Sequence, residues 1–126
     1  MTNILVVDDT VDAAESLALL LDTLGHETHT AFDGAQALVA AEKYAPHIIF
    51  LDLDMPIRNG YEAAQSIRRS RLTDHPFIVA LTGQSGDEVR RQADAAGFDF
   101  YMQKPANPTA LLALVSDLEG RQRPAT

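Results

Sequence analysis

The stretch Ile48–Pro56, which reads IIFLDLDMP, decides the fold prediction. A run of bulky apolar residues leads directly into Asp52 and Asp54. Continuous apolar runs of this kind are typical of strands that are buried on both faces of a parallel sheet. Packing does not explain the two carboxylates, because burying a charge is costly. The stretch therefore predicts a buried strand that carries acidic side chains to one edge of a sheet.

Strand patterns and helix patterns alternate along the rest of the chain. Apolar runs predict strands over residues 3–7, 47–51, 76–82 and 98–102, and HETHTAF at 26–32 is a weaker strand pattern. Segments with helical spacing of apolar residues follow each run, and the first of them has Val11, Ala14, Ala18 and Leu21 on one face. Five strand–helix pairs favour a doubly wound parallel five-stranded sheet with helices on both faces, which is an α/β fold.

Turn and capping residues predict where several helices begin. Asn59–Gly60 is a turn dipeptide before a helix over residues 61–71, in which Ala64 and Ile67 point inward. Ser85 with Glu88 predicts a capping box at the start of the fourth helix. Asn107–Pro108 predicts a cap followed by proline in the first helical position of the last helix.

Composition limits the class of protein. The 126 residues fit one domain, expected over residues 1–120, with a short tail at 121–126 and no output domain. The net charge of −8 argues against nucleic-acid binding, and the arginine clusters at 68–71 and 90–91 fit a solvated helix face. No apolar run is long enough to cross a membrane, and the N-terminus lacks the pattern of a signal peptide. Cysteine is absent, so a cytoplasmic location is expected.

Chemically active residues follow four of the five predicted strands. Asp8–Asp9 follow the first, Asp52 and Asp54 the third, Thr82 ends the fourth, and Lys104 comes after the fifth. Each residue alone has an ordinary explanation as a turn, a cap, a strand residue or a surface residue. Because the carboxyl ends of parallel strands meet at one edge of the sheet, we expect these side chains to lie together.

Such a gathering suits phosphoryl transfer. Neighbouring carboxylates repel one another unless a cation neutralises them, and Mg²⁺ takes oxygen ligands of this type. A hydroxyl and an ammonium group can share the oxygens of a transferred phosphoryl group with the metal. A carboxylate oxygen would then be the nucleophile and would form an acyl phosphate.

The chain resembles the receiver domains of bacterial two-component response regulators. The motifs that carry the resemblance are LVVDD at 5–9, LDLDMPIRNG at 51–60, ALTG at 80–83 and YMQKP at 101–105. The resemblance covers residues 3–119 and implies a flavodoxin-like fold with strand order 2-1-3-4-5. It implies that a sensor histidine kinase or a histidine phosphotransfer protein donates a phosphoryl group in a Mg²⁺-dependent reaction.

The resemblance assigns a role to each site residue. Asp52 corresponds to the phosphoacceptor, and Asp9 would bind Mg²⁺ directly. Asp8 would support the metal directly or through water. Asp54 would offer its backbone carbonyl to the metal while its side chain points elsewhere. Lys104, together with the Thr82 hydroxyl, would bind the phosphoryl oxygens.

Further positions would govern the response to phosphorylation. Tyr101 matches the switch aromatic of the family, although a half-buried tyrosine at a strand end would have the same pattern. Asp54 and Gln84 are placed to modulate hydrolysis of the acyl phosphate. Pro105 would follow a cis peptide bond. The family usually has alanine where Gly83 stands in this chain.

The last predictions concern the oligomeric state and the way in which the domain passes on its signal. Residues 106–119 contain no Lys or Arg, so the dimer that one large subgroup forms through its fourth helix, fifth strand and fifth helix is in doubt. A monomer or weak dimer is expected, acting through a partner protein. The chain would be a single-domain regulator or the receiver of a hybrid histidine kinase.

Two other functions compete with this interpretation. The sequence DLDMP partly matches the D-x-D motif of haloacid-dehalogenase-like phosphatases, but those enzymes have it on the first strand. A receiver domain would not be a turnover enzyme. A turnover assay with a phosphate monoester therefore distinguishes the two, because only the phosphatase would hydrolyse it repeatedly. A flavodoxin-like binding module without phosphorylation would not need Thr82 and Lys104 beside four acids. The four histidines show no helical i, i+4 pair and are not expected to bind metal.

Overall fold

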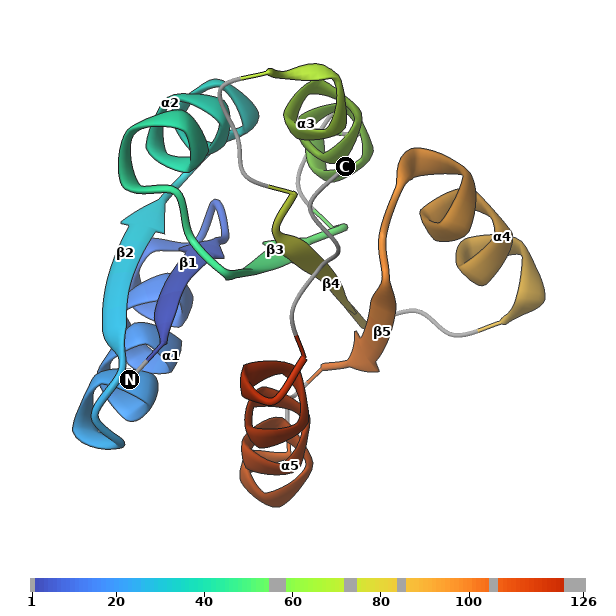
Figure 1. Ribbon diagram of the computed structural model, residues 1–126. Coiled ribbons are helices and arrows are strands. Elements are labelled where there is room, and N and C mark those ends of the chain that lie inside the picture. Colours follow the sequence, from blue (N-terminus) through green and yellow to red (C-terminus); the bar gives the residue numbers. More distant parts are fainter. Residues whose placement is uncertain (1, 55–58, 72–74, 84–85, 105–106, 122–126) are drawn as a thin grey trace.

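The computed structural model describes residues 2–54, 59–71, 75–83, 86–104 and 107–121 (Figure 1). Strands and helices alternate strictly along the chain. They are β1 (Asn3–Val7), α1 (Val11–Thr23), β2 (Glu27–Ala31), α2 (Gly34–Tyr44), β3 (Ile48–Asp52), α3 (Asn59–Arg69), β4 (Phe77–Thr82), α4 (Asp87–Ala96), β5 (Phe100–Gln103) and α5 (Pro108–Glu119). The five strands form one parallel sheet in the order β2-β1-β3-β4-β5. The predicted fold class and strand order are confirmed.

The register of the sheet aligns the carboxyl ends of its central strands. Val7 of β1 lies opposite Leu51 of β3, so the residues that follow them, Asp8 and Asp52, are neighbours. In the same way Thr82 of β4 lies opposite Gln103 of β5, the residue before Lys104. The sheet thus brings the predicted site residues of four strands to one edge.

Two apolar layers hold the helices against the sheet. On one face, α1 and α5 bury their apolar residues against Ile4, Phe50 and Val79. On the other face, α2, α3 and α4 pack mainly with alanines against Leu5, Ile49 and other strand residues. Every residue of β3 and β4 is buried, which explains their continuous apolar sequences.

Polar side chains cap α2 and α5, and the predicted cap at Asn107 is confirmed. The Asp33 side chain accepts a hydrogen bond from the Gln36 backbone N–H at 2.7 Å. The Asn107 side chain accepts one from the Thr109 N–H at 2.9 Å, and Pro108 occupies the first turn. Each cap satisfies a backbone donor that the helix itself leaves unpaired.

Three local predictions need correction or lie outside the described residues. Asn59–Gly60 begins α3 and is not a turn. A Cβ on Gly60 would lie 2.4 Å from the Asp52 carbonyl oxygen, so glycine is required here for close packing of two backbone segments. Val11 is 46% exposed and does not point inward. Helix α4 has Gly86 as its N-cap, and the predicted capping residue Ser85 is outside the described residues.

Within the described part of the chain, none of the helices combines the length and the apolar character that crossing a bilayer requires.

Candidate functional site

Three carboxylates meet at the carboxyl edge of the sheet. Oxygen atoms of Asp8, Asp9 and Asp52 all lie within 4.8 Å of one another. Asp8 and Asp52 are buried, whereas Asp9 is exposed. The structure therefore brings together the acids of β1 and β3 that the sequence placed at one edge.

Backbone hydrogen bonds orient the two buried acids. One carboxylate oxygen of Asp8 accepts a hydrogen bond from the Thr10 N–H at 3.0 Å, at the point where the chain turns into α1. Asp52 accepts one from the Asp54 N–H at 2.8 Å. Each acid thus supports the turn that follows its own strand, while its second oxygen stays outside that bond.

Lys104 supplies a positive charge to this cluster. Its Nζ lies 2.9 Å from Asp52 Oδ1, 3.7 Å from Asp8 Oδ2 and 4.0 Å from Asp54 Oδ2. The Lys104 N–H donates to the Thr82 carbonyl at 2.7 Å, which extends the β4–β5 pairing and fixes the start of the side chain. Lys104 is therefore the counterion of Asp52, the buried carboxylate that the sequence predicts as the phosphoacceptor.

The pKa values of two groups reflect this crowding. Burial raises the pKa of Asp8 to about 6, the hydrogen bond from the Thr10 N–H opposes the rise, and the nearby charge of Asp52 adds to it. Burial alone would lower the pKa of Lys104, but its hydrogen bond to Asp52 and the charges of Asp52, Asp8 and Asp54 outweigh burial and raise it. Lys104 is therefore cationic at neutral pH, whereas the acid cluster resists carrying its full negative charge.

The Asp54 side chain points toward the end of β4 and does not belong to the cluster of Asp8, Asp9 and Asp52, and the role of its backbone carbonyl stays a prediction. Its Oδ1 accepts a hydrogen bond from the Thr82 hydroxyl at 2.8 Å, and its Oδ2 accepts one from the Gly83 N–H at 2.7 Å. A Cβ on Gly83 would lie 3.4 Å from Asp54 Oδ2, an ordinary contact at the tight end of the range. The sequence carries no signal for this contact, because a residue after a strand end can turn toward either neighbour.

Tyr101 lies on β5 beside α4. Its ring is partly buried and packs against the core formed by α2, α3 and α4. The Arg90 guanidinium carbon is 5.3 Å from the centre of the ring, which is within the range of a cation–π contact. Gln84 and Pro105, for which the sequence also predicts roles, are outside the described residues.

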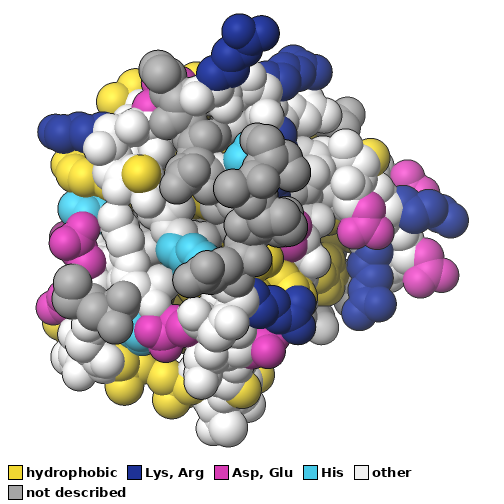
Figure 2. Space-filling model, viewed as in Figure 1, with side chains coloured by type: hydrophobic (Ala, Val, Ile, Leu, Met, Phe, Trp, Pro, Cys, Tyr) yellow, Lys and Arg dark blue, Asp and Glu magenta, His cyan; other side chains and the backbone are white. Residues whose placement is uncertain are grey.

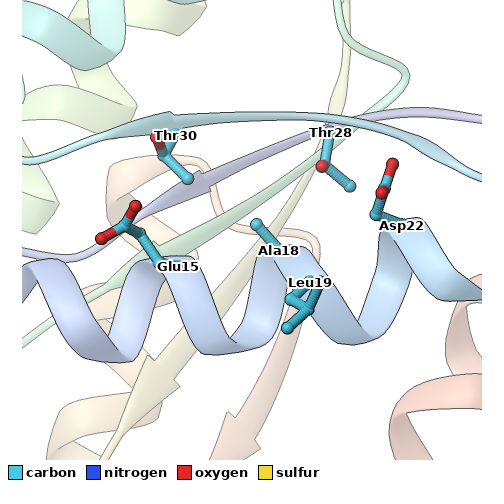
Figure 3. Close-up of a pocket in the computed structure, with 6 residues that line it drawn as sticks. All are labelled: Glu15, Ala18, Leu19, Asp22, Thr28 and Thr30. Atoms are coloured by element: carbon cyan, nitrogen blue, oxygen red, sulfur yellow. The ribbon is translucent and has the colours of Figure 1, made fainter.

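An apolar groove borders the acid cluster. It has a volume of about 540 Å³ and is lined by Asp8, Ala13, Ser16, Leu17, Leu20, Leu81 and Lys104. A second groove lies between α1 and β2, where Glu15 and Asp22 approach Thr28 and Thr30 (Figure 3). The second groove includes none of the three clustered acids, so the first is the one that adjoins the candidate site.

On the face drawn in Figure 2, Lys and Arg side chains lie at several places around the outline, two of them side by side at the top, and no broad basic patch covers this face. The interpretation of the arginine clusters as solvated helix faces fits Arg91, whose side chain is 72% exposed, but is wrong for Arg68, whose side chain is 23% exposed.

Comparison with known proteins places the chain in a family. A family model for the response regulator receiver domain matches residues 4–116. The chain belongs to this family of two-component signalling domains. The resemblance that the sequence motifs carry is thereby confirmed.

Individual relatives of known structure share the fold. The chemotaxis protein CheY4 of Vibrio cholerae is 30% identical and superposes with a TM-score of 0.86, covering 94% of this chain and 98% of that chain. The receiver domain of sensor histidine kinase PA1611 from Pseudomonas aeruginosa is 28% identical, with a TM-score of 0.84 and coverage of 95% and 98%. That structure holds a magnesium ion in its active site cleft.

A longer relative shows how the domain occurs elsewhere. Transcriptional regulatory protein PrrA of Mycobacterium leprae is 38% identical over 123 residues, which cover 98% of this chain. The chain spans about half the length of PrrA and of the other transcriptional regulators that it matches.

Proposed function

We propose that the protein accepts a phosphoryl group from a phosphohistidine onto Asp52. In this step a carboxylate oxygen of Asp52 attacks phosphorus, and the phosphorus–nitrogen bond to the donor breaks. The electron pair of that bond stays on the donor imidazole. The observation that carries the proposal is the buried Asp52 carboxylate, 2.9 Å from the Lys104 ammonium and adjacent to two further acids.

The acid cluster fits a divalent cation. Asp8, Asp9 and Asp52 supply hard oxygen ligands from three carboxylates whose oxygens lie within 4.8 Å. Burial and then the nearby charge of Asp52 raise the pKa of Asp8, and a cation bound beside these acids would favour the ionised form of Asp8. When bound there, Mg²⁺ neutralises charge on the acids and on the phosphoryl oxygens. The magnesium ion in the related PA1611 receiver supports the same assignment.

Lys104 and Thr82 would bind oxygens of the transferred group. The ammonium of Lys104 already faces Asp52, so it needs little movement to contact a phosphoryl oxygen. The Thr82 hydroxyl donates to Asp54 and must redirect that bond toward the phosphoryl group. The movement of Thr82 would be the first step of the conformational switch. Tyr101 on the adjacent strand β5 would respond to that movement.

The donor would approach along the apolar groove beside Asp8 and Lys104. Leu17 and Leu20 of α1 give this groove an apolar wall, which suits a packed helix of a histidine kinase or a phosphotransfer protein. The phosphorylated domain would then act through a separate output protein. In this role the domain takes part in one phosphotransfer per cycle and is not a turnover enzyme.

Intact-mass measurement after incubation with acetyl phosphate and Mg²⁺ tests the proposal. One phosphoryl group is expected on the wild type, and none when Mg²⁺ is chelated. Asp52→Asn should remain unmodified, while Asp117→Asn at an exposed position near the end of α5 should be modified normally. Phosphorylation of Asp52→Asn at the wild-type rate would refute the assignment. Repeated turnover of a phosphate monoester would favour the phosphatase alternative.

A further inference from the structure

Arg68 joins four segments of the chain at the sheet edge opposite the candidate site. Its Nε donates to the Gly97 carbonyl at 2.9 Å, and its Nη1 donates to the Pro76 carbonyl at 2.7 Å. Its Nη2 is 2.6 Å from Asp99 Oδ2. The same Asp99 oxygen accepts the Ile78 N–H at 2.9 Å. One arginine of α3 thus holds the end of α4, the entrance to β4 and the entrance to β5.

The end of α4 is shaped to receive this side chain. Gly97 has φ +102, a left-handed conformation that closes the helix and that other residues rarely adopt. A Cβ at Gly97 would lie 2.8 Å from Arg68 Cγ, so a larger residue would displace the arginine. Arg68 and Asp99 side chains are each 23% exposed, which reduces the screening of their ion pair by solvent.

Among the described residues, the beginning of α4 buries less of its surface than the end does. Its N-cap Gly86 has φ +130 and, as a glycine, has no side chain that could accept a hydrogen bond from the first turn. The helix buries only Ala93 and Ala96 completely, and both lie in its C-terminal half. The N-terminal half carries the exposed pair Arg91–Glu88 and the partly buried Val89. Helix α4 is therefore anchored at the end that is remote from Thr82.

We propose that Arg68 is a positioning residue for the phosphorylation switch and makes α4 pivot about Gly97. A change at Thr82 and Gly83 acts on the less buried end of α4. Because the other end is fixed to Asp99, the helix rotates and does not slide as a whole. Asp99 lies two residues before Tyr101, so the same anchor keeps β5 in place while the Arg90 contact to the Tyr101 ring changes. This inference rests on the proposed function, since it needs Asp52 to be the phosphoryl site.

Amide chemical shifts and hydrogen exchange test the pivot in the full chain, with Mg²⁺ and beryllofluoride as a phosphate mimic. In the wild type, shifts are expected at Asp52, Thr82, Gly83 and residues 87–91, with little change at 96–99. In Arg68→Met, which keeps an apolar stem but loses the three donors, the response should spread to 96–99. Exchange of the Gly97 and Phe98 amides should become at least tenfold faster.

Two further variants separate positioning from general destabilisation. Arg91→Met removes an exposed arginine–glutamate pair of the same helix and should leave the wild-type pattern unchanged. Asp99→Asn keeps an oxygen for the Ile78 N–H, weakens the ion pair with Arg68, and should give an intermediate spread if Arg68→Met does not fold.

The possible outcomes distinguish the two hypotheses. If the mimic causes no shifts around Asp52 and Thr82 in the wild type, the proposed function fails. If those shifts occur but residues 96–99 move as strongly as 87–91 in the wild type, the pivot is refuted. The pivot is also refuted if, in both Arg68→Met and Asp99→Asn, the chemical-shift changes stay within residues 87–91 and do not spread to 96–99.

Discussion

Replacement of Asp8 by Asn should stabilise the protein without metal and destabilise it relative to the wild type with Mg²⁺. The pKa of Asp8 is raised from 3.8 to about 6, chiefly by burial. The contribution of Asp8 to folding stability is therefore complete below pH 4 and is lost as the pH rises through about 6. Asparagine cannot ionise, and its oxygen can still accept the Thr10 N–H, so it avoids this loss.

The expected change in the free energy of unfolding follows from the shift in the pKa of Asp8. Two pKa units correspond to about 3 kcal/mol, and screening by solvent at the open rim of the site reduces this to about 1–2 kcal/mol. Metal-free Asp8→Asn should exceed the wild type by this amount at pH 7.5 and should match it near pH 4. Mg²⁺ at 100 times its dissociation constant would add about 2.7 kcal/mol to the wild type. The variant, which lacks one proposed ligand, should gain much less.

Urea unfolding at pH 4, 5, 6 and 7.5, with EDTA or with Mg²⁺, measures both effects. Glu15→Gln is a matched control, because it removes one negative charge from an exposed position of α1. It should change the free energy of unfolding by less than about 0.5 kcal/mol. The reasoning is refuted if metal-free Asp8→Asn is less stable than the wild type at pH 7.5. It is also refuted if Mg²⁺ stabilises both proteins equally.

Three other substitutions test separate parts of the site. Lys104→Met should reduce metal-free stability by about 2 kcal/mol in urea unfolding, because Asp52 loses its counterion, and an unchanged stability would contradict that role. Gly60→Ala should cost more than about 2 kcal/mol in the same assay, since its Cβ would clash with the Asp52 carbonyl. Gly25→Ala is the control for Gly60→Ala, because Gly25 has φ +93 but no atom within 4 Å of an added Cβ, and it should cost only about 1 kcal/mol of backbone strain. Equal losses of stability in the two variants would refute the clash at Gly60. Asp54→Ala should still be phosphorylated but should change the half-life of the acyl phosphate several-fold, followed by intact mass, and an identical half-life would exclude it as a modulator.

Strand positions and the meeting of the acids were accessible from the sequence because both depend on regular patterns. The apolar run of β3 ends at Asp52 in the sequence and in the sheet. Parallel pairing then places Asp8 beside Asp52 without any knowledge of side-chain detail. Caps such as Asn107 were equally predictable, because their hydrogen bonds reach only two or three residues along the chain.

Contacts between distant segments were not accessible in this way. Asn59–Gly60 has the sequence of a turn but lies in the first turn of α3. The need for glycine at position 60 comes from the close approach of α3 to the Asp52 backbone, which the local sequence does not reveal. The direction of the Asp54 side chain depends on two donors that lie 28 and 29 residues later in the chain. Arg68 belongs to a sequence cluster that looked solvated, yet its donors reach backbone carbonyls of two other segments.

The two hydrogen bonds to Asp54 make its carboxylate an internal substitute for the phosphoryl group. The Thr82 hydroxyl and the Gly83 N–H hold an anion of the chain itself in the resting protein. Under the proposed function, an incoming phosphoryl group would have to displace the Asp54 carboxylate from these two donors. The free energy available for the proposed switch would be the difference between the binding of the phosphoryl group and the binding of the Asp54 carboxylate to the same two donors, so a modest change in the solvation of Asp54 would alter the fraction of activated molecules.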